Sequence, residues 1–473
     1  MSTTSELVFI PLPIIGHLVS MVEMAKLLVD RDDRLSVTVL IMKFPFDSMI
    51  DSSVESLTAS VATRIRFVLL PLQIPSLETS PMAFLYRFVE SHKANVRQAV
   101  ANLSACSLPR LKGLVVDMMC TSMIDVAVEF NIPSYVFIPS GMAYLGLMLY
   151  LQSLQDEQRM DLTTLNGSDA ELAFPCFANP LPATKFLPLE LLMKEDRQIS
   201  MGHARRYRES KGILVNTFAE LEPRAVEALA GLGAPVVYPV GPILNIEVES
   251  KKSFEFLDWL HQQPDASVVF LCFGSHGSFD EDQVKEIACA LERSRCRFLW
   301  SLRRPPAKGK LEAPCDYADP AEVLPEGFID RTAGVGRVIG WAPQVAILAH
   351  QAIGGFVSHC GWNSTLESIW FGVPIATWPH YAEQQFNAFQ LVVELGLAAE
   401  IKMDYRRDLI KGSDSIVMAD EIEGGIRRLM EGEKAEERRK KVKEASEKSR
   451  KALMEGGSSY LSLGRFIEDV TSQ

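Results

Sequence analysis

The segment GGFVSHCGWNSTLESIWFGVP, residues 354–374, decides the fold. Its uncharged start is typical of a buried strand, which leads through the short loop 359–362 into a helix that opens near Asn363 and Ser364. A helix that begins at the carboxyl end of a strand presents unpaired N–H groups and a partial positive charge. Such a helix start suits a diphosphate.

Two interpretations of this helix start stay open. Gly361 lets the backbone approach a ligand, and His359 can add a hydrogen bond to it. The spacing of Ser364 and Glu367 equally matches a capping box, in which Glu367 bonds back to the helix start and no ligand is needed.

The surrounding residues favour a nucleotide sugar. Trp341 offers a flat apolar face on which a base could stack, with Gln344 three residues later, although a structural tryptophan is commoner than a stacking one. A carboxylate repels a diphosphate, so Glu367 suggests sugar hydroxyls as its partner. Glu383 and Gln384 follow another apolar run and supply an acceptor and a donor for a second sugar. Base, ribose, diphosphate and sugar together describe one ligand.

Short apolar runs alternate with helical patterns along the whole chain. Continuous apolar runs, such as 112–117 and 267–275, indicate strands buried on both faces and therefore parallel sheets. At 473 residues the chain is too long for one hydrophobic core. We predict two doubly wound α/β domains, 1–245 and 246–454, joined through the polar stretch after residue 245.

Composition and terminal features narrow the function. A net charge of −12 disfavours binding of nucleic acid by bulk charge. The first residues lack a basic signal-peptide region, and the uncharged stretch 134–151 is interrupted by Pro139-Ser140-Gly141, so we expect strand, turn and helix rather than a membrane span. The charged stretch 431–452 is interpreted as a solvated helix. These features predict a cytoplasmic protein.

Other phosphate and metal motifs are absent. The chain has neither GxGxxG after its first strand nor GxxxxGK[ST], which counts against dinucleotide oxidoreductases and P-loop NTPases. The triplets 30–32 and 280–282 have the form DxD but adjoin predicted helix ends, where acidic residues are common. We therefore expect no metal and no cofactor.

His17 and Asp117 are the candidate catalytic pair. His17 lies in the loop after the first strand, and Asp117 ends the buried strand GLVVD. Both positions fall at the carboxyl edge of the sheet, and a buried carboxylate needs a partner. A His–Asp pair fixes the imidazole tautomer and stabilises the imidazolium, so His17 can act as a base near neutral pH.

Residues 341–384, WAPQVAILAHQAIGGFVSHCGWNSTLESIWFGVPIATWPHYAEQ, closely resemble the 44-residue signature of plant UDP-dependent glycosyltransferases of family 1. The likeness extends over the chain through PLPIIGHL, FLCFGS and the closing GGSSY. It implies the GT-B fold, with two Rossmann-like domains facing across a cleft. Acceptor binding then falls to 1–245, with 455–473 crossing back to it, and donor binding to 246–454.

The resemblance also implies roles for individual residues. His17 and Asp117 would be the catalytic base and its partner. The residues expected to bind the donor are Ser275, Trp341, Ala342, Gln344, His359, Trp362, Asn363, Ser364, Glu367, Glu383 and Gln384. Candidate walls of the acceptor pocket are Ile15, Phe84, Met118, Met119, Ser140, Phe186, His380 and Tyr381. For Phe84, Met118, Met119, Phe186 and Tyr381, a place in the ordinary core is the commoner interpretation.

The expected function is that of an inverting glucosyltransferase. It would move glucose from UDP-glucose, a co-substrate, to a hydroxyl of a small phenolic or other lipophilic acceptor such as a flavonoid, giving a β-O-glucoside. Gln384 favours glucose as the sugar, because galactose users of the family often carry His there. A UDP-sugar-binding protein without transfer activity and a UDP-sugar epimerase are the alternatives. A monomer with no nucleic-acid partner is expected.

Overall fold

The computed structural model describes residues 5–43, 57, 64–75, 80–105, 110–167, 169–246, 255–307, 312–408, 412–413 and 415–472. The chain forms two compact units. Unit 1 comprises residues 1–180, 190–245 and 451–473, and unit 2 comprises residues 181–189 and 246–450.

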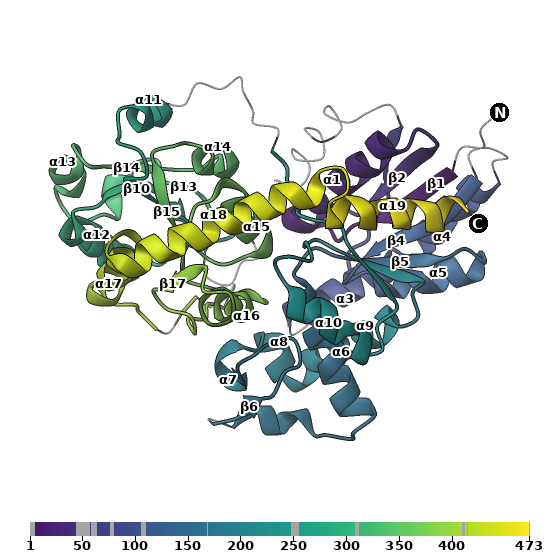
Figure 1. The fold of residues 1–473 in the computed structure, drawn as a ribbon. Coiled ribbons are helices and arrows are strands. Elements are labelled where there is room, and N and C mark those ends of the chain that lie inside the picture. Colours follow the sequence, from purple (N-terminus) through teal and green to yellow (C-terminus); the bar gives the residue numbers. More distant parts are fainter. Residues whose placement is uncertain are drawn as a thin grey trace. The chain divides into compact units, whose positions relative to one another are not determined.

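Unit 1 is built on a parallel sheet of seven strands in the order β3-β2-β1-β4-β5-β8-β9 (Figure 1). The strands are β1 (Ser5–Ile10), β2 (Leu35–Ile41), β3 (Ile65–Leu69), β4 (Arg110–Asp117), β5 (Ser134–Ile138), β8 (Gly212–Val215) and β9 (Val236–Pro239). The main helices of this unit are α1 (Ile15–Arg31), α3 (Pro81–Ser91), α4 (Lys93–Ser104), α5 (Ile124–Glu129), α6 (Met142–Asp156), α9 (Lys194–Tyr207), α10 (Pro223–Gly231) and α19 (Ser458–Thr471). β1 and β5 are buried along their whole length, as their continuous apolar sequences predict.

Unit 2 has a parallel sheet of six strands in the order β14-β11-β10-β15-β16-β17. The strands are β10 (Val268–Cys272), β11 (Arg297–Ser301), β14 (Gly336–Ile339), β15 (Ile353–Ser358), β16 (Ile375–Thr377) and β17 (Ala398–Glu400). Its helices include α11 (Glu255–His261), α12 (Glu281–Ser294), α13 (Phe328–Thr332), α14 (Gln344–Leu348), α15 (Trp362–Phe371), α16 (Gln384–Phe389) and α17 (Ala419–Met430). The pattern of two doubly wound sheets agrees with the sequence analysis.

Shorter elements connect these parts. They are the 3₁₀ turns η1 (Thr121–Met123), η2 (Leu162–Asn166) and η3 (Pro320–Glu322), the π-helical turn η4 (Gln390–Glu394), the short helices α7 (Ala183–Phe186) and α8 (Leu189–Leu192), and the two-residue strands β6 (Glu171–Leu172), β7 (Leu181–Pro182), β12 (Arg303–Arg304) and β13 (Cys315–Asp316).

Both sheets reverse their winding at a central pair of strands. In unit 1, β1 and β4 are neighbours, with Ile10 opposite Val116. In unit 2, β10 and β15 are neighbours, with Cys272 opposite Ser358. The loops that leave such a pair at its carboxyl end diverge to opposite faces of the sheet, and ligands of doubly wound proteins bind there. Each unit therefore has one favoured position for a site.

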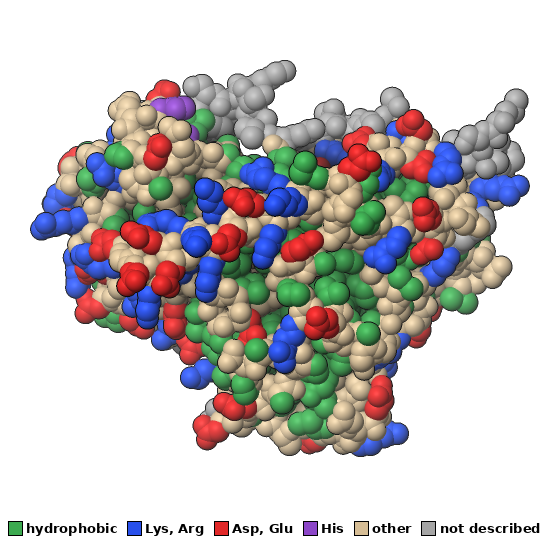
Figure 2. All heavy atoms as spheres, in the orientation of Figure 1, with side chains coloured by type: hydrophobic (Ala, Val, Ile, Leu, Met, Phe, Trp, Pro, Cys, Tyr) green, Lys and Arg blue, Asp and Glu red, His purple; other side chains and the backbone are tan. Residues whose placement is uncertain are grey.

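The charged helix α18 (Glu433–Leu453) is followed by α19, which packs on the sheet of unit 1 beside β9 and β4. Figure 2 shows basic and acidic side chains interspersed over α18, as a solvated helix requires. α19 is fixed by Phe466, whose ring meets Tyr135 and Tyr238 edge-on at centroid distances of 5.0 and 5.5 Å.

The segment 181–189 differs from the predicted domain boundary, which placed it with residues 1–245. It belongs to unit 2, where Nη2 of Arg406 donates to the carbonyl oxygens of Thr184, Lys185 and Leu187. The ring of Phe186 lies 4.9 Å from that of Phe389. The three hydrogen bonds from Arg406 and the aromatic contact explain why this segment belongs to unit 2. A pattern of apolar residues in the sequence does not reveal such contacts.

We predict that Phe466→Ala destabilises unit 1 by about 3–5 kcal/mol, because it leaves a cavity between two buried tyrosines. Leu461 on the same helix is 55% exposed, so Leu461→Ala is the matched control and should change stability by less than about 0.5 kcal/mol. Urea denaturation of the full chain measures both effects. Equal shifts for the two variants would contradict the assigned packing of α19.

Candidate functional site

The structure brings His17 and Asp117 together at the switch point of unit 1. His17 lies in the first turn of α1 and not in the predicted loop, because the helix already begins at Ile15. Nδ1 of His17 lies 2.8 Å from Oδ2 of Asp117, and the other carboxylate oxygen accepts the N–H of Met119 at 2.9 Å. Asp117 is fully buried, whereas the side chain of His17 is 25% exposed. Donation from Nδ1–H to the carboxylate places the imidazole lone pair on Nε2, which is the arrangement that a general base needs.

The loop after β15 forms a constrained helix start. Cys360 adopts a left-handed backbone with φ of 62°, and Gly361 is the N-cap of α15. The first backbone hydrogen bond of the helix runs from the N–H of Thr365 to the carbonyl of Gly361 at 2.9 Å. The N–H groups of residues 362–364 precede that bond and lie at the positive end of the helix.

His359 is held between two glycines. A Cβ at either Gly274 or Gly361 would lie 2.6 Å from its Nε2, closer than real contacts allow. Its Nδ1 is buried and has no hydrogen-bond partner within the described part of the chain. Burial, with a smaller effect from the nearby His276, lowers the pKa of His359 to about 4. The imidazole is therefore neutral here, with hydrogen-bonding capacity left for a ligand.

The capping-box interpretation is wrong. The N-cap of α15 is Gly361, three residues before Ser364, and it makes no side-chain cap bond. Glu367 is held instead by Gln344, whose Nε2 donates to Oε2 of Glu367 at 2.6 Å and to Oγ of Ser364 at 2.8 Å. Three of the predicted residues from α14 and α15 thus form one polar cluster.

The carboxyl of Glu367 has a pKa near neutral pH. Burial raises its pKa to about 7, although the hydrogen bond from Gln344 acts in the opposite direction. Trp341 lies beside this cluster in the sequence, 49% exposed, with the guanidinium of Arg303 5.2 Å from its ring centre. Ala342 next to it is buried. A half-exposed indole and a partly buried carboxyl are side chains of the kind that a nucleoside needs.

Two of the residues expected at the sugar, Glu383 and Gln384, lie at the start of α16, where Glu383 is the N-cap. Ser275, expected at the diphosphate, lies in the turn after β10. Oε1 of Gln384 accepts the N–H groups of His380 and Tyr381 at 2.8 and 3.1 Å. The oxygen of Gln384 therefore orders its own loop, a role that the sequence did not reveal.

Sequence reasoning also missed Asn387. This buried side chain on α16 donates from Nδ2 to the carbonyl of Cys360 at 3.0 Å. It therefore supports the left-handed residue directly before the helix start, and it joins the loop after β15 to the helix that carries Gln384. Nothing in the local sequence signals a bond across 27 positions.

The candidate acceptor residues divide between the two units. Ile15 begins α1, Met118 and Met119 follow Asp117, Ser140 follows β5, and Phe84 is buried on α3 with its ring 6.4 Å from that of Phe88. In unit 2 lie Phe186, Tyr381 and the buried His380, which stacks on Phe273 at a centroid distance of 5.3 Å.

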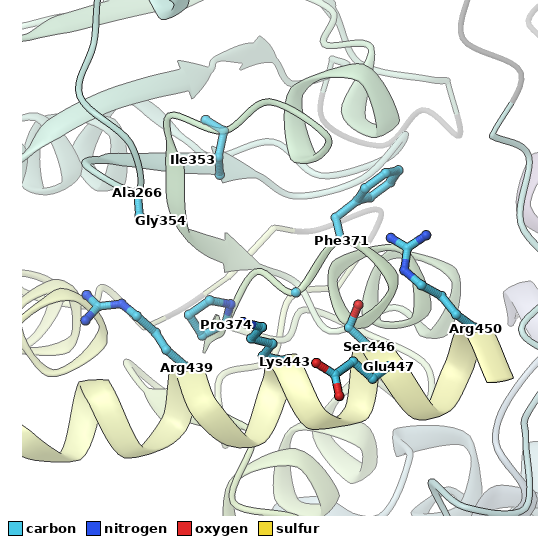
Figure 3. Close-up of a pocket in the computed structure, with 11 residues that line it drawn as sticks. Ala266, Ile353, Gly354, Phe371, Pro374, Arg439, Lys443, Ser446, Glu447 and Arg450 are labelled. Carbon is cyan, nitrogen blue, oxygen red and sulfur yellow. The ribbon is translucent and has the colours of Figure 1, made fainter.

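A hollow of about 470 Å³ lies at the opposite edge of the second sheet, where β10, β15 and β16 begin (Figure 3). Its wall on α18 includes two residues that donate to the carbonyl of Trp370, Ser446 through Oγ at 2.7 Å and Arg450 through Nη2 at 2.9 Å. Trp370 is in the last turn of α15, so the cation complements the negative end of that helix. The hollow is thus distinct from the site at the start of α15.

The described part of the chain offers neither a cluster of metal ligands nor a membrane-spanning helix. In the described residues, His, Cys, Asp and Glu side chains nowhere gather in a group of three that could hold a metal ion. No helix in the described part of the chain combines the length and apolar character that a bilayer crossing needs.

The two doubly wound units, the His–Asp pair and the amide-rich helix start define a nucleotide-sugar-dependent enzyme of the GT-B fold. Residues 234–418 match the family model described as "UDP-glucoronosyl and UDP-glucosyl transferase". The chain is 56% identical to UDP-glucose flavonoid 3-O-glucosyltransferase 6 of Fragaria ananassa, an alignment that covers 99% of each chain.

Solved structures agree. A UGT transferase from Siraitia grosvenorii in complex with UDP is 51% identical, with a TM-score of 0.88 over 99% of this chain and 100% of that chain. UGT71G1 of Medicago truncatula, complexed with UDP-glucose, is 41% identical, with a TM-score of 0.87 over 100% of this chain and 99% of that chain. The chain belongs to the UDP-glycosyltransferase family, which confirms the resemblance found in the sequence.

We predict that Glu367 makes the stability of unit 2 depend on pH. Its ordinary pKa of 4.5 rises to about 7 on folding, so the folded protein keeps a proton that the unfolded chain releases. Stability therefore falls as pH rises from 4.5 to 7, and the loss is complete above pH 7. Glu367→Gln removes this loss, so its advantage over wild type should grow with pH, by up to about 3 kcal/mol.

Chemical denaturation of both proteins at pH 5, 6, 7 and 8 tests this expectation. Glu433→Gln, at an exposed position of α18, is the control and should show no such trend. A constant difference between Glu367→Gln and wild type across the four pH values would contradict the predicted state of this carboxyl.

Proposed function

We propose that the protein is an inverting glucosyltransferase that moves glucose from UDP-glucose to a hydroxyl of a small phenolic acceptor. The observation that carries the proposal is the hydrogen bond between His17 and the buried Asp117 at the switch point of unit 1. The flavonoid glucosyltransferase named above, at 56% identity, supports the acceptor class and the sugar.

The donor would bind in unit 2. The uracil stacks on Trp341, beside the backbone of Ala342 and the side chain of Gln344, and the ribose hydroxyls donate to Glu367. The groups proposed to hold the diphosphate are the N–H groups at the start of α15 with Ser275, His359, Asn363 and Ser364. The sugar contacts Trp362, Glu383 and Gln384. Because Oε1 of Gln384 already accepts two backbone N–H groups, its amide nitrogen is the group offered to the sugar.

We propose the following chemistry for these residues. Nε2 of His17 takes the proton of the acceptor hydroxyl as that oxygen forms a bond with the anomeric carbon, and the bond from that carbon to UDP breaks. Asp117 stabilises the imidazolium that results. UDP leaves without a protein acid, because the helix start stabilises its negative charge. One displacement inverts the anomeric carbon, so an α-linked donor gives a β-glucoside.

We propose that residues of both units contribute to acceptor binding. Ile15, Met118, Met119, Ser140 and Phe84 are the walls that we propose from unit 1, and Phe186, His380 and Tyr381 are those from unit 2. We further propose a cytoplasmic monomer that uses UDP-sugar as its co-substrate and no metal or other cofactor.

Two other functions would use the same UDP site. A UDP-sugar-binding protein would hold the donor without turnover, and an epimerase would change the free sugar. Incubation with UDP-glucose and a panel of phenols, analysed by mass spectrometry, separates the three. A product heavier by one hexose supports transfer. Conversion of the free UDP-sugar, or clear UDP binding with no product, overturns the proposal of glucosyl transfer.

His17→Ala should lower the turnover number by about 10²–10⁴-fold, because the acceptor hydroxyl loses its base. UDP affinity, measured by calorimetry, should stay within about twofold, since His17 takes no part in donor binding. Asp117→Asn is the companion variant and should also reduce turnover, because the imidazole loses its tautomer and its stabilising charge. Turnover that survives in His17→Ala would refute the assigned base.

Trp341→Ala should weaken UDP binding by about 5- to 150-fold, which corresponds to the roughly 1–3 kcal/mol that base stacking on an aromatic ring supplies. Phe371→Ala, at the C-terminal end of α15 in the wall of the hollow, is the control and should leave UDP affinity unchanged. Calorimetric titration with UDP measures both variants. Unaltered UDP affinity in Trp341→Ala would show that the uracil ring does not stack on Trp341.

A further inference from the structure

A second histidine lies close to Asp117 and has no role in the mechanism above. His203 on α9 is 3% exposed, and its Nδ1 lies 2.8 Å from Oγ1 of Thr121. Thr121 begins η1, four residues after Asp117, so this pair lies in the loop region at the carboxyl end of β4. Asp117 is near enough to act electrostatically on His203.

Two buried polar groups at this place have no partner among the described residues. They are Nε2 of His203 and Oγ of Ser122, which is the next residue after Thr121. A buried polar group that makes no hydrogen bond costs about 1–3 kcal/mol. A buried polar group without a protein partner is therefore usually satisfied by a ligand or a water.

An aromatic side chain contacts this histidine. The ring of Tyr86 on α3 meets His203 edge-on at a centroid distance of 6.0 Å, and Phe84 lies on the same helix. One turn after His203, the hydroxyl of Tyr207 donates to the carbonyl of Met118 at 3.2 Å. α9 is thereby fixed against the loop that carries Met118 and Met119, which are proposed acceptor contacts.

We propose that Nε2 of His203 hydrogen-bonds a second oxygen of the acceptor, distant from the hydroxyl that receives glucose. This inference rests on the proposed function and makes His203 a specificity-determining residue. It favours phenolic acceptors with a second hydroxyl or carbonyl group over those with a single hydroxyl.

The chemistry of the imidazole agrees with this role. Burial lowers the pKa of His203 to about 4, so the ring is neutral and offers one donor and one acceptor. Thr121 uses the Nδ1 side. If the hydroxyl of Thr121 donates to Nδ1, then Nε2 carries the hydrogen and donates to a carbonyl or phenolic oxygen. The ring thus offers one polar atom to a ligand, beside the ring of Tyr86.

Paired acceptors test the inference. The probes are 2-naphthol and the naphthalenediols that keep its reacting hydroxyl and add a second hydroxyl at each other ring position. With saturating UDP-glucose, wild type should favour at least one diol over 2-naphthol by about tenfold in kcat/KM, the worth of one buried hydrogen bond. His203→Leu should reduce that preference to within about twofold while turnover of 2-naphthol persists. His203→Gln should restore part of the preference.

His92→Leu is the matched control. His92 is also fully buried, with Nδ1 bonded to the carbonyl of Phe88 at 2.9 Å and Nε2 unpartnered within the described residues. It should keep the wild-type preference. A preference that is absent in wild type, unchanged in His203→Leu, or lost equally in His92→Leu overturns the inference. Absence of turnover of every acceptor by wild type would instead refute the proposed function.

Discussion

The bond between His17 and the buried carboxylate of Asp117 is the constraint on which the account depends. The side chain of Asp117 is buried in unit 1, where a polar group needs hydrogen-bond partners, and the described residues supply the imidazole of His17 and the N–H of Met119. Because β1 and β4 are neighbours, residues a hundred positions apart meet at one sheet edge. The topology of the sheet thereby creates an oriented base on a rigid support.

In unit 2, the same sheet topology creates a candidate binding site for an anion. Its switch point lies between β10 and β15, and the loops that leave these strands carry Gly274 and Gly361, between which His359 is held. A left-handed Cys360 turns the chain into α15, and Asn387 supports that turn. The site is therefore a preorganised set of donors, and little rearrangement is needed when a diphosphate arrives.

Much of this arrangement could be predicted from the sequence, for identifiable reasons. Continuous apolar runs indicate strands that are buried on both faces. Residues at the carboxyl ends of such strands lie at one edge of the sheet, and this position predicts that His17 and Asp117 are close together. The spacing of Ser364 and Glu367 wrongly suggested a capping box. A capping box requires its serine at the N-cap, but α15 begins at Trp362, two residues before Ser364. Bonds between distant segments, such as Arg406 to Thr184–Leu187 or His203 to Thr121, leave no periodic pattern.

The anomeric configuration of the first product tests the central claim most directly. If an imidazole in unit 1 activates the acceptor while UDP leaves from the opposite side of the sugar, one displacement occurs and the configuration inverts. Proton NMR of the glucoside formed from α-linked UDP-glucose should then show the large anomeric coupling of a β-linkage from the earliest turnovers. An α-glucoside would require a second displacement or a front-side attack, and it would contradict the account.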